Sequence, residues 1–181
     1  DASAGRGRHR ACSSGRFDGG RRTPRQAAAA QAAGAEARRV GIVPDEPKAF
    51  LSALQAELAD ADLVVTSGGV SQGDFDVVKL VLDRIGRMQW LQVAIKPAKP
   101  FAFGLLSAGG GETPLFGLPG NPVSSMVSFE LFARPALRQM MGHRHPGRLE
   151  VVGLADAPLR RRPDGKVHFQ RVHGAFGPDG R

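Results

Sequence analysis

The sequence predicts an α/β protein: a three-layer, mostly parallel sheet covered by helices, followed by an incomplete β-rich C-terminal unit. PKAFLSALQAELADA (residues 47–61) has apolar residues at helical spacing and runs into the β-branched stretch ADLVVT (residues 61–66). A Gly-rich loop and a second helical pattern follow directly. This alternation favours parallel strands, because a parallel pair needs a crossover helix between its strands.

Composition divides the 181 residues into three parts. Residues 1–33 are rich in Gly, Arg, Ala and Ser and have no hydrophobic period, so we expect a disordered or non-native head. Residues 34–146 carry the alternating patterns and are expected to form the α/β domain. Residues 147–181 have short strand patterns around a Pro-Asp-Gly turn, which predicts a partial, β-barrel-like C-terminal domain.

Charge and hydropathy argue against several classes of partner. The net charge is +8, but nine Arg and three acidic residues fall within residues 1–40, so +6 of it belongs to this part. Because basic and aromatic residues do not interleave elsewhere, no specific nucleic-acid partner is expected. No apolar stretch approaches the roughly 20 residues that cross a bilayer, so we expect no membrane partner and a cytoplasmic location. The single cysteine, Cys12, cannot form an internal disulfide.

Each element of the domain follows from a local pattern. A short apolar strand is expected at residues 40–43, before a Pro-Asp turn. The helix over residues 47–61 brings four apolar side chains to one side: Phe50, Leu51, Leu54 and Leu58. The next helix ends at Gly86 and is expected to pack through Val77, Leu80, Val81 and Ile85.

Two strands and a long helix complete the domain. MQWLQVAI (residues 88–95) and FAFGLL (residues 101–106) read as strands that flank KPAKP (residues 96–100). PLFGLPGNP (residues 114–122) then leads into a helix over residues 122–141, which Pro135 should kink or shorten because proline has no backbone N–H.

The loop TSGGVSQGDFD (residues 66–76) combines groups that suit an anion with groups that repel one. Three glycines and two serine hydroxyls suit the anion: Gly68, Gly69, Gly73, Ser67 and Ser71. Asp74 and Asp76 oppose it. Asp76 has a plain alternative role as the N-cap of the following helix, and Asp74 as a solvated turn residue. If a phosphate binds here, both carboxylates suggest an intervening Mg²⁺ or a general base.

Two further stretches favour a ligand. IKPAKP holds Lys96 and Lys99 three residues apart between prolines, which suits a dianion, although solvated surface lysines remain the alternative. LPGNPVSS forms a second Gly/Pro turn that opens a helix. Its candidate binding residues are Pro119, Gly120, Asn121 and Ser124, and a plain strand-to-helix connection is the alternative.

TSGGVSQGDFD, AIKPAKPFAFG and LFGLPGNPVSSMVSFELFARPAL, in this order, resemble the molybdopterin molybdenumtransferase family, which includes MoeA and the E domain of gephyrin. The resemblance implies a molybdopterin-binding-like fold, insertion of molybdate into adenylylated molybdopterin with release of AMP, a requirement for Mg²⁺, and a homodimer. By motif position it implies that Asp76 and Asp74 serve catalysis and the metal. It also implies that Lys96, Lys99, Ser124 and Arg171 (in HFQRV) line the molybdate and pterin-phosphate site.

The sequence departs from this family at several points. Ala98 stands where KPGKP has glycine, which predicts a negative φ at residue 98, and Gln72 stands where an apolar residue is common. Residues 1–33 do not read as the first strand and Gly-rich substrate loop of the family domain. The alternatives are therefore a non-catalytic molybdopterin-binding or scaffold fragment, or a molybdopterin adenylyltransferase.

Overall fold

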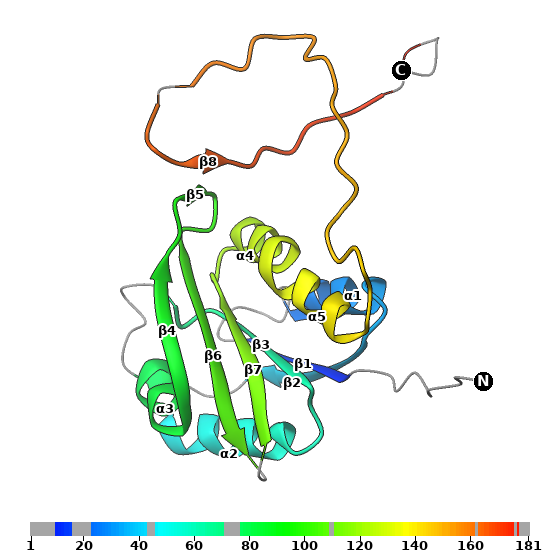
Figure 1. Cartoon of the computed structure of the whole chain (residues 1–181). Helices are drawn as coiled ribbons and strands as arrows, with labels where there is room; N and C mark the ends of the chain where they lie inside the picture. Colours follow the sequence, from blue (N-terminus) through cyan, green and yellow to red (C-terminus); the bar gives the residue numbers. More distant parts are fainter. Residues whose placement is uncertain are drawn as a thin grey trace, which may run out of the picture.

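The computed structural model describes residues 10–15, 23–42, 46–70, 77–108, 111–161, 163–175 and 177. Its centre is a six-stranded sheet in the order β2-β1-β3-β7-β6-β4 (Figure 1). The strands are β1 (Arg10–Gly15), β2 (Glu36–Ile42), β3 (Leu63–Ser67), β4 (Gly86–Gln92), β6 (Pro100–Ala108) and β7 (Gly111–Leu118). The pairs β1–β2, β1–β3 and β3–β7 are parallel, whereas β6 runs antiparallel to both β7 and β4. The sheet is therefore mixed.

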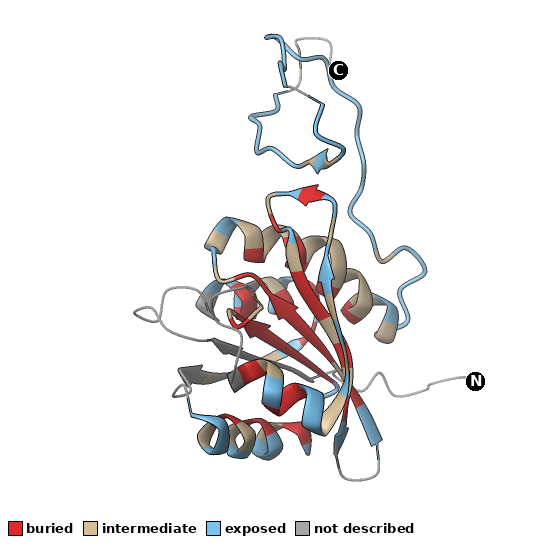
Figure 2. Ribbon diagram, turned by 90° about the vertical axis from the view of Figure 1, so that its left-hand side faces the viewer, coloured by how far each residue is buried: buried red, intermediate tan, exposed pale blue. Residues whose placement is uncertain are grey.

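Helices cover both faces of this sheet, which confirms the three-layer α/β prediction. One face carries α1 (Thr23–Ala32) and the run α4 (Pro122–Ser128), η1 (Phe129–Ala133) and α5 (Arg134–Met140). The other carries α2 (Pro47–Leu58) and α3 (Val77–Ile85). Buried residues line the strands between these layers (Figure 2).

Strand alternation divides the core into two clusters. Successive residues of a strand point to opposite faces, so Leu63 and Val65 pack toward α1 and α5, while Val64 packs toward α2 and α3. The predicted face of α2 is confirmed for Phe50, Leu54 and Leu58, which are buried, and Leu51 is partly buried beside them.

The predicted face of α3 is wrong at one position. Leu80 is 67% exposed, whereas Val78, Val81 and Leu82 are buried. The residues at positions 78, 81, 82 and 85 also follow helical spacing, so the sequence pattern allowed two overlapping faces. The position of α2, which contacts α3, decides between them.

The predicted long helix over residues 122–141 is present, but its middle is a π-turn instead of a simple kink. The Arg134 N–H donates to the Phe129 carbonyl five residues earlier, and Pro135 sits in the first turn of α5. A proline within a helix leaves the carbonyl four residues before it without a donor, and a wider turn accommodates this locally.

The prediction of a disordered or non-native head is wrong for residues 10–15 and 23–33, which the structure describes. β1 lies inside the sheet between β2 and β3, and α1 buries Ala27 and Ala30 against the domain, followed by Ala33 directly after the helix. The domain therefore begins before residue 34, and the first strand is present. Alanine is small and only weakly apolar, so the composition of this segment gave no hydrophobic signal. An alanine-rich helix can nevertheless pack closely against a sheet.

The predicted β-rich unit after residue 147 is not found among the residues described there. They include one short strand, β8 (Val167–His168), which pairs in parallel with β5 (Ile95–Lys96). The remaining described residues form an extended path that leaves the domain and returns to the connection between β4 and β6, which contains β5 (Figure 1). Gly165, with φ +70°, supports the predicted Pro-Asp-Gly turn, but no hairpin surrounds it among these residues.

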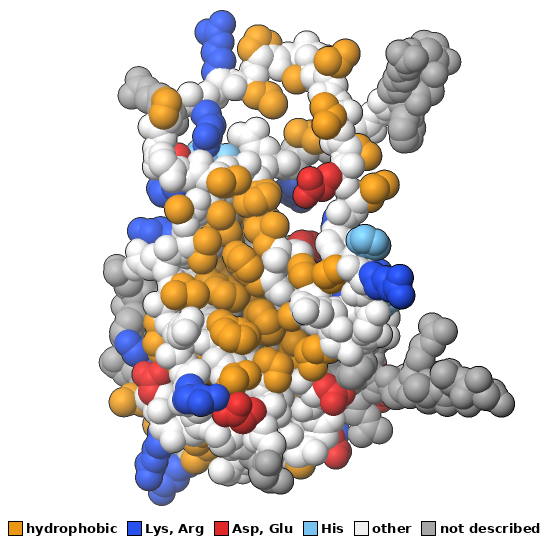
Figure 3. Space-filling view, in the orientation of Figure 1, with side chains coloured by type: hydrophobic (Ala, Val, Ile, Leu, Met, Phe, Trp, Pro, Cys, Tyr) orange, Lys and Arg blue, Asp and Glu red, His pale blue; other side chains and the backbone are white. Residues whose placement is uncertain are grey.

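Part of the sheet has a helix layer on one side only. Hydrophobic side chains gather over β6 and β7 on the face seen in Figure 3. Phe103 and Leu105 of β6 are only partly buried there, and Leu91 of β4 is 42% exposed.

Within the described residues, no helix is both long enough and apolar enough to span a membrane.

The contact between β4 and β6 depends on a glycine, which generates a stability prediction. A Cβ added to Gly104 would lie 2.2 Å from Sδ of Met88 and 2.6 Å from the Arg87 carbonyl oxygen. Gly104→Ala should therefore lower the free energy of unfolding by about 1–3 kcal/mol, the usual cost of overpacking. Urea denaturation measures this change.

Gly153→Ala is the matched control, because a Cβ there would meet nothing within 4 Å. It should shift the urea midpoint little. Equal midpoints for the two variants would contradict the proposed close approach of β4 and β6.

Candidate functional site

Three parallel strands end together at one edge of the sheet. Gly15 of β1 pairs with Ser67 of β3, and Ser67 pairs with Leu118 of β7. The Gly68 N–H donates to the Leu118 carbonyl oxygen at 2.9 Å, so the two loops that leave β3 and β7 begin side by side. This edge is where open α/β sheets bind their ligands. The structure thus brings Ser67 and Gly68 next to the turn that contains Pro119.

The first loop turns sharply on two glycines. Gly68 has φ +91° and Gly69 has φ +75°, a region of backbone conformation that favours glycine. A Cβ at Gly69 would also lie 2.8 Å from a methyl carbon of Val78, at the start of α3. Both residues therefore need to be glycine for structural reasons, whether or not a ligand binds.

Two hydroxyls at the end of β3 are buried without a hydrogen-bond partner in the described structure. They belong to Thr66, 4% exposed, and Ser67, 3% exposed. A buried hydroxyl usually has a partner, because desolvation without one costs free energy. The hydrogen-bonding capacity of the Ser67 hydroxyl is thus not used by the residues that the structure describes.

The rest of the predicted loop lies outside the described residues. It includes Ser71, Gly73, Asp74 and Asp76. The choice between helix cap and metal or catalytic carboxylate at Asp76 therefore stays open. Among the residues that the structure does describe, no group of three or more His, Cys, Asp or Glu is arranged to hold a metal ion.

The second loop is held by a helix cap. The Asn121 side-chain oxygen accepts hydrogen bonds from the backbone N–H groups of Val123, at 3.0 Å, and Ser124, at 3.2 Å. This oxygen therefore caps the helix, a role that the sequence analysis did not predict for Asn121. The cap fixes Gly120 and Ser124 on either side of it at the start of α4.

The lysine-bearing hairpin reaches the same edge from the other half of the sheet. Because β4 and β6 are antiparallel and β6 opposes β7, the connection between β4 and β6 lies at the ends of β3 and β7. Lys96 and Lys99 are both exposed on it. A hydrogen bond of 2.8 Å from the Val93 N–H to the Lys99 carbonyl closes the base of this turn.

The predicted negative φ at Ala98 is wrong. Ala98 has φ +82° and is 4% exposed, so a buried side chain occupies a conformation that normally suits glycine. The peptide bond between Lys96 and Pro97 is cis. The turn between the two lysines therefore has a defined and unusual backbone shape.

Arg171 reaches the hairpin through β8. The Val167 N–H donates to the Ala94 carbonyl at 2.9 Å and the Phe169 N–H donates to the Lys96 carbonyl at 2.8 Å. Arg171 follows two residues later and is exposed. The structure thus brings the segment that carries Arg171 to the hairpin that carries Lys96.

Gln26 is a residue near this site that the sequence reading missed. It is 2% exposed, and its side-chain amide donates to the hydroxyl of Ser125, also 2% exposed, which joins α1 to the first part of α4. Its own carbonyl oxygen and the hydroxyl of Ser128 are buried without partners in the described structure. The run contains two amides, and the signal that could have identified Gln26 is its helical spacing with Ala30 and Ala33, which are buried, whereas Gln31 is exposed.

Comparison with known proteins gives a consistent picture. The profile of the family described as "Probable molybdopterin binding domain" matches residues 21–139. Molybdopterin molybdenumtransferase of Haemophilus influenzae is 38% identical over 136 residues, which cover 73% of this chain and 32% of that protein. Molybdopterin molybdenumtransferase 2 of Mycobacterium tuberculosis is 38% identical over 155 residues, which cover 81% and 36%. The chain thus spans about a third of the length of these curated relatives.

Solved structures share the fold. The molybdopterin biosynthesis MoeA protein from Pyrococcus horikoshii superposes with a TM-score of 0.60 at 25% identity, over 75% of this chain and 36% of that one. The tungsten cofactor synthesizing protein MoaB from Pyrococcus furiosus gives a TM-score of 0.60 at 16% identity, over 76% of this chain and 98% of that one. The second likeness concerns the fold alone.

Backbone strain at Ala98 generates one prediction. Ala98→Gly should raise the free energy of unfolding by about 0.5–1 kcal/mol, because relief of the left-handed conformation, about 1–2 kcal/mol, exceeds the added entropy of glycine in the unfolded chain. Thermal unfolding measures the gain. Ala102→Gly, in the buried part of β6, should instead lower the melting temperature. A loss of stability in both variants would contradict the strain.

The contact between α1 and α4 generates a second prediction about stability. Gln26→Leu and Ser125→Ala should each lower the free energy of unfolding by about 1–3 kcal/mol, because each leaves a buried polar group without its partner. The double variant should cost clearly less than the sum of the two, which a double-mutant cycle in urea would show. Strict additivity would mean that the two side chains do not interact.

Proposed function

The chain belongs to the family of the probable molybdopterin binding domain, and on that premise we propose that it acts in molybdenum-cofactor synthesis by inserting molybdate into adenylylated molybdopterin with release of AMP. The observation that carries the proposal is the common register of β1, β3 and β7. It places the glycine loop and the Asn121 turn at one edge, and the lysine hairpin stands at the same edge. Similarity to the molybdenumtransferases supports the choice of reaction.

The described residues supply an anion-binding surface. We assign the dianionic molybdate to Lys96, Lys99 and Arg171, since ammonium and guanidinium groups form the strong, charge-assisted hydrogen bonds to oxyanions. The backbone N–H of Gly69 and the hydroxyl of Ser67, which has no partner among the described residues, would bind phosphate oxygens, whereas the Gly68 N–H is already used by the Leu118 carbonyl. Ser71 and Gly73 extend that loop, and Pro119, Gly120, Asn121 and Ser124 would form the opposite wall.

The carboxylates of Asp74 and Asp76 are the proposed metal ligands and catalytic groups. Both supply the hard oxygen ligands that suit Mg²⁺. Bound there, Mg²⁺ would neutralise charge on the adenylate phosphate. Asp76 would orient the water molecule that attacks the adenylate phosphorus and would accept its proton. The P–O bond to the molybdopterin phosphate would break, so that AMP leaves with the water oxygen and molybdopterin keeps its phosphate.

A second candidate function has a specific observation in its favour. The family whose profile matches residues 21–139 is described as a molybdopterin binding domain, without a reaction, so binding of molybdopterin without catalysis, as a scaffold or accessory domain, is the alternative. We also propose that the chain forms the homodimer that the family resemblance implies. Light scattering of the purified chain would test the dimer separately.

Molybdate binding tests the anion site. Lys96→Ala and Lys99→Ala should each weaken molybdate binding by about tenfold, since a hydrogen bond to a charged group is worth about 1.5–3 kcal/mol. Isothermal titration at fixed ionic strength measures it. Lys48→Ala, on the exposed start of α2, is the matched control and should bind as the parent chain does. Unchanged binding in both hairpin variants would contradict the assignment.

Release of AMP tests the reaction in the same preparations. Adenylylated molybdopterin is supplied with molybdate and Mg²⁺, and a time course compares the parent chain with Asp76→Asn. We expect release by the parent chain and a loss of at least about a hundredfold in the variant, as for removal of a general acid or base. Tight binding without AMP release by either protein would favour the scaffold function. ATP consumption without molybdate would indicate an adenylyltransferase.

A further inference from the structure

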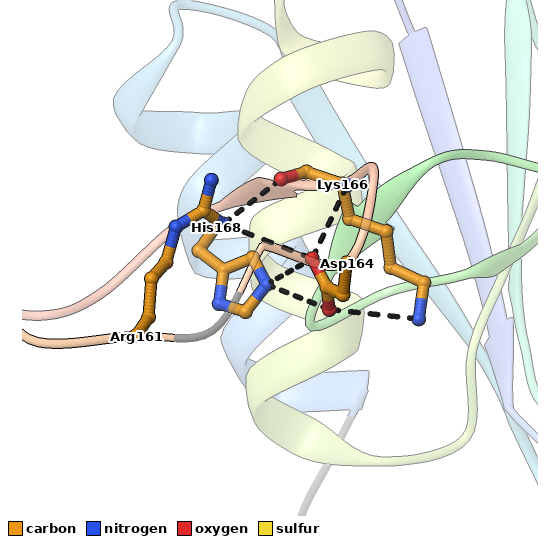
Figure 4. Close-up of polar contacts among 4 residues, drawn as sticks. All are labelled: Arg161, Asp164, Lys166 and His168. Carbon is orange, nitrogen blue, oxygen red and sulfur yellow. Dashed lines mark hydrogen bonds and ion pairs between the residues drawn. The ribbon is translucent and has the colours of Figure 1, made fainter.

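The glycine loop and the C-terminal segment are ordered by different kinds of contact. Close to β8, three polar side chains surround the carboxylate of Asp164 (Figure 4): Arg161, Lys166 and His168. The described half of the glycine loop, residues 67–70, carries a single apolar side chain, that of Val70. It follows the two glycines with positive φ and packs onto the sheet. An apolar contact therefore orders this loop from within the domain.

Gly117 is an unusual residue for its place in β7. It pairs in regular register with Thr66 of β3 and with Ala102 of β6, so no bulge explains it. Glycine weakens the interior of a strand, because it has no side chain to pack, and it often marks either a bulge or a close approach of another group. The reason for a glycine here is therefore a close approach.

The Val70 side chain is one of two groups that make this approach. A Cβ on Gly117 would lie 2.8 Å from Cγ1 of Val70 and 2.9 Å from Cβ of Ala102. Gly117 and Ala102 are buried, and Val70 is partly buried. Because both carbons lie within 3 Å of the same point, Val70 packs over β7 at its border with β6. We call this packing of Val70 on Gly117 the Val70 contact.

The two residues before Val70 are also joined to the domain. The Gly68 N–H donates to the Leu118 carbonyl at 2.9 Å, and Gly69 lies against Val78 at the start of α3. Neither glycine has a side chain, and glycine passes readily between conformations with positive and negative φ. Val70 is thus the first residue after β3 whose side chain can restrict the path of the loop. Its packing limits the conformations open to the glycines before it.

We propose that Val70 is a positioning residue, which through its contact with Gly117 holds Gly68 and Gly69 in the conformation in which the Gly69 N–H binds the adenylate phosphate. The Val70 contact itself needs no ligand, whereas its effect on phosphate binding rests on the proposed function. Gly117 takes part because it leaves room for the valine methyl group. A change at either residue should therefore alter the loop in the absence of any ligand.

Amide exchange measured by NMR tests the Val70 contact without ligand. The Gly68 amide reports on the loop, and the Ala35 amide, bonded to the Ala30 carbonyl at 3.1 Å, reports on the other face of the domain. Val70→Ala and Gly117→Ala should each lower the protection factor of Gly68 relative to that of Ala35 by about tenfold, because a weakly held segment opens locally. Unchanged protection of Gly68, or an equal loss at both amides, would overturn the proposal.

Two single variants are the controls. Val70→Ile keeps both carbons attached to Cβ and should keep most of the Gly68 protection. Val40→Ala makes the same truncation at a partly buried valine of β2 and should leave the ratio of the two protection factors unchanged. A loss at Gly68 in Val40→Ala as large as that in Val70→Ala would contradict a specific role for Val70.

Two double variants separate the two neighbours of Gly117. Gly117→Ala with Val70→Ala should lose less protection than the two single losses combined, because the added methyl group takes space that the valine has left. Gly117→Ala with Ala102→Gly removes the crowding of β6 but leaves that of Val70, so Gly68 protection should stay low. Full recovery in the second double variant would overturn the role of Val70.

AMP titration followed by NMR, in the presence of Mg²⁺, tests the link to phosphate binding. Affinity should be about tenfold weaker in Val70→Ala and Gly117→Ala, since small displacements of a binding group are costly, and unchanged in Val70→Ile and Val40→Ala. Unchanged affinity in variants whose Gly68 amide has lost protection would overturn the link between the Val70 contact and the site. Absence of AMP binding by the parent chain would instead contradict the proposed function, while the exchange data still decide whether the contact orders the loop.

Discussion

The register of β3 between its two parallel neighbours is the constraint on which the rest of the structure depends. Leu63 and Val65 face one helix layer and Val64 faces the other, so a slip by one residue would reverse both cores. The same register ends β3 beside Leu118, where the Gly68 N–H closes the edge with one hydrogen bond. Core packing and the position of the two loops are thus set by a single pairing. The core therefore fixes the points at which the two loops leave the sheet.

The sequence predicted those parts of the fold whose signal is local and strongly apolar. The buried strand at Leu63–Ser67, the helix at Pro47–Leu58 and the end of the next helix at Gly86 all follow from spacing and turn residues. It failed for the described part of residues 1–33, because β1 and α1 are stabilised by what they pack against and not by their own hydrophobicity. Leu80 shows the same limit, since two overlapping faces satisfied the helical period and only the neighbouring α2 distinguishes them.

The candidate site was predictable in its residue types and less so in its geometry. The glycine loop, the lysine pair and the LPGNP turn could be identified from chemistry, but their meeting at one edge depends on long-range pairing, including the reversed direction of β6. The left-handed backbone at Ala98 ran against the preference of alanine, so no local rule could have predicted it. Gln26 was missed because its partner, Ser125, lies 99 residues away in the sequence. The carboxylates of Asp74 and Asp76 lie outside the described residues, and their roles still rest on the sequence pattern.

The two sides of the site differ in how firmly they are held, and this difference has a chemical consequence. Ser67 and the Asn121 turn are fixed by the sheet register, the helix cap and the buried contact between Gln26 and Ser125. In the part of the chain that the structure describes, the segment that carries Arg171 is joined to the domain by the short β5–β8 pairing. A rigid wall can bind one part of a substrate with little loss of entropy, whereas a cation on a loosely held segment adds its charge only after that segment docks. Such an order suits a reaction that first binds a nucleotide-linked substrate and then takes up a small oxyanion.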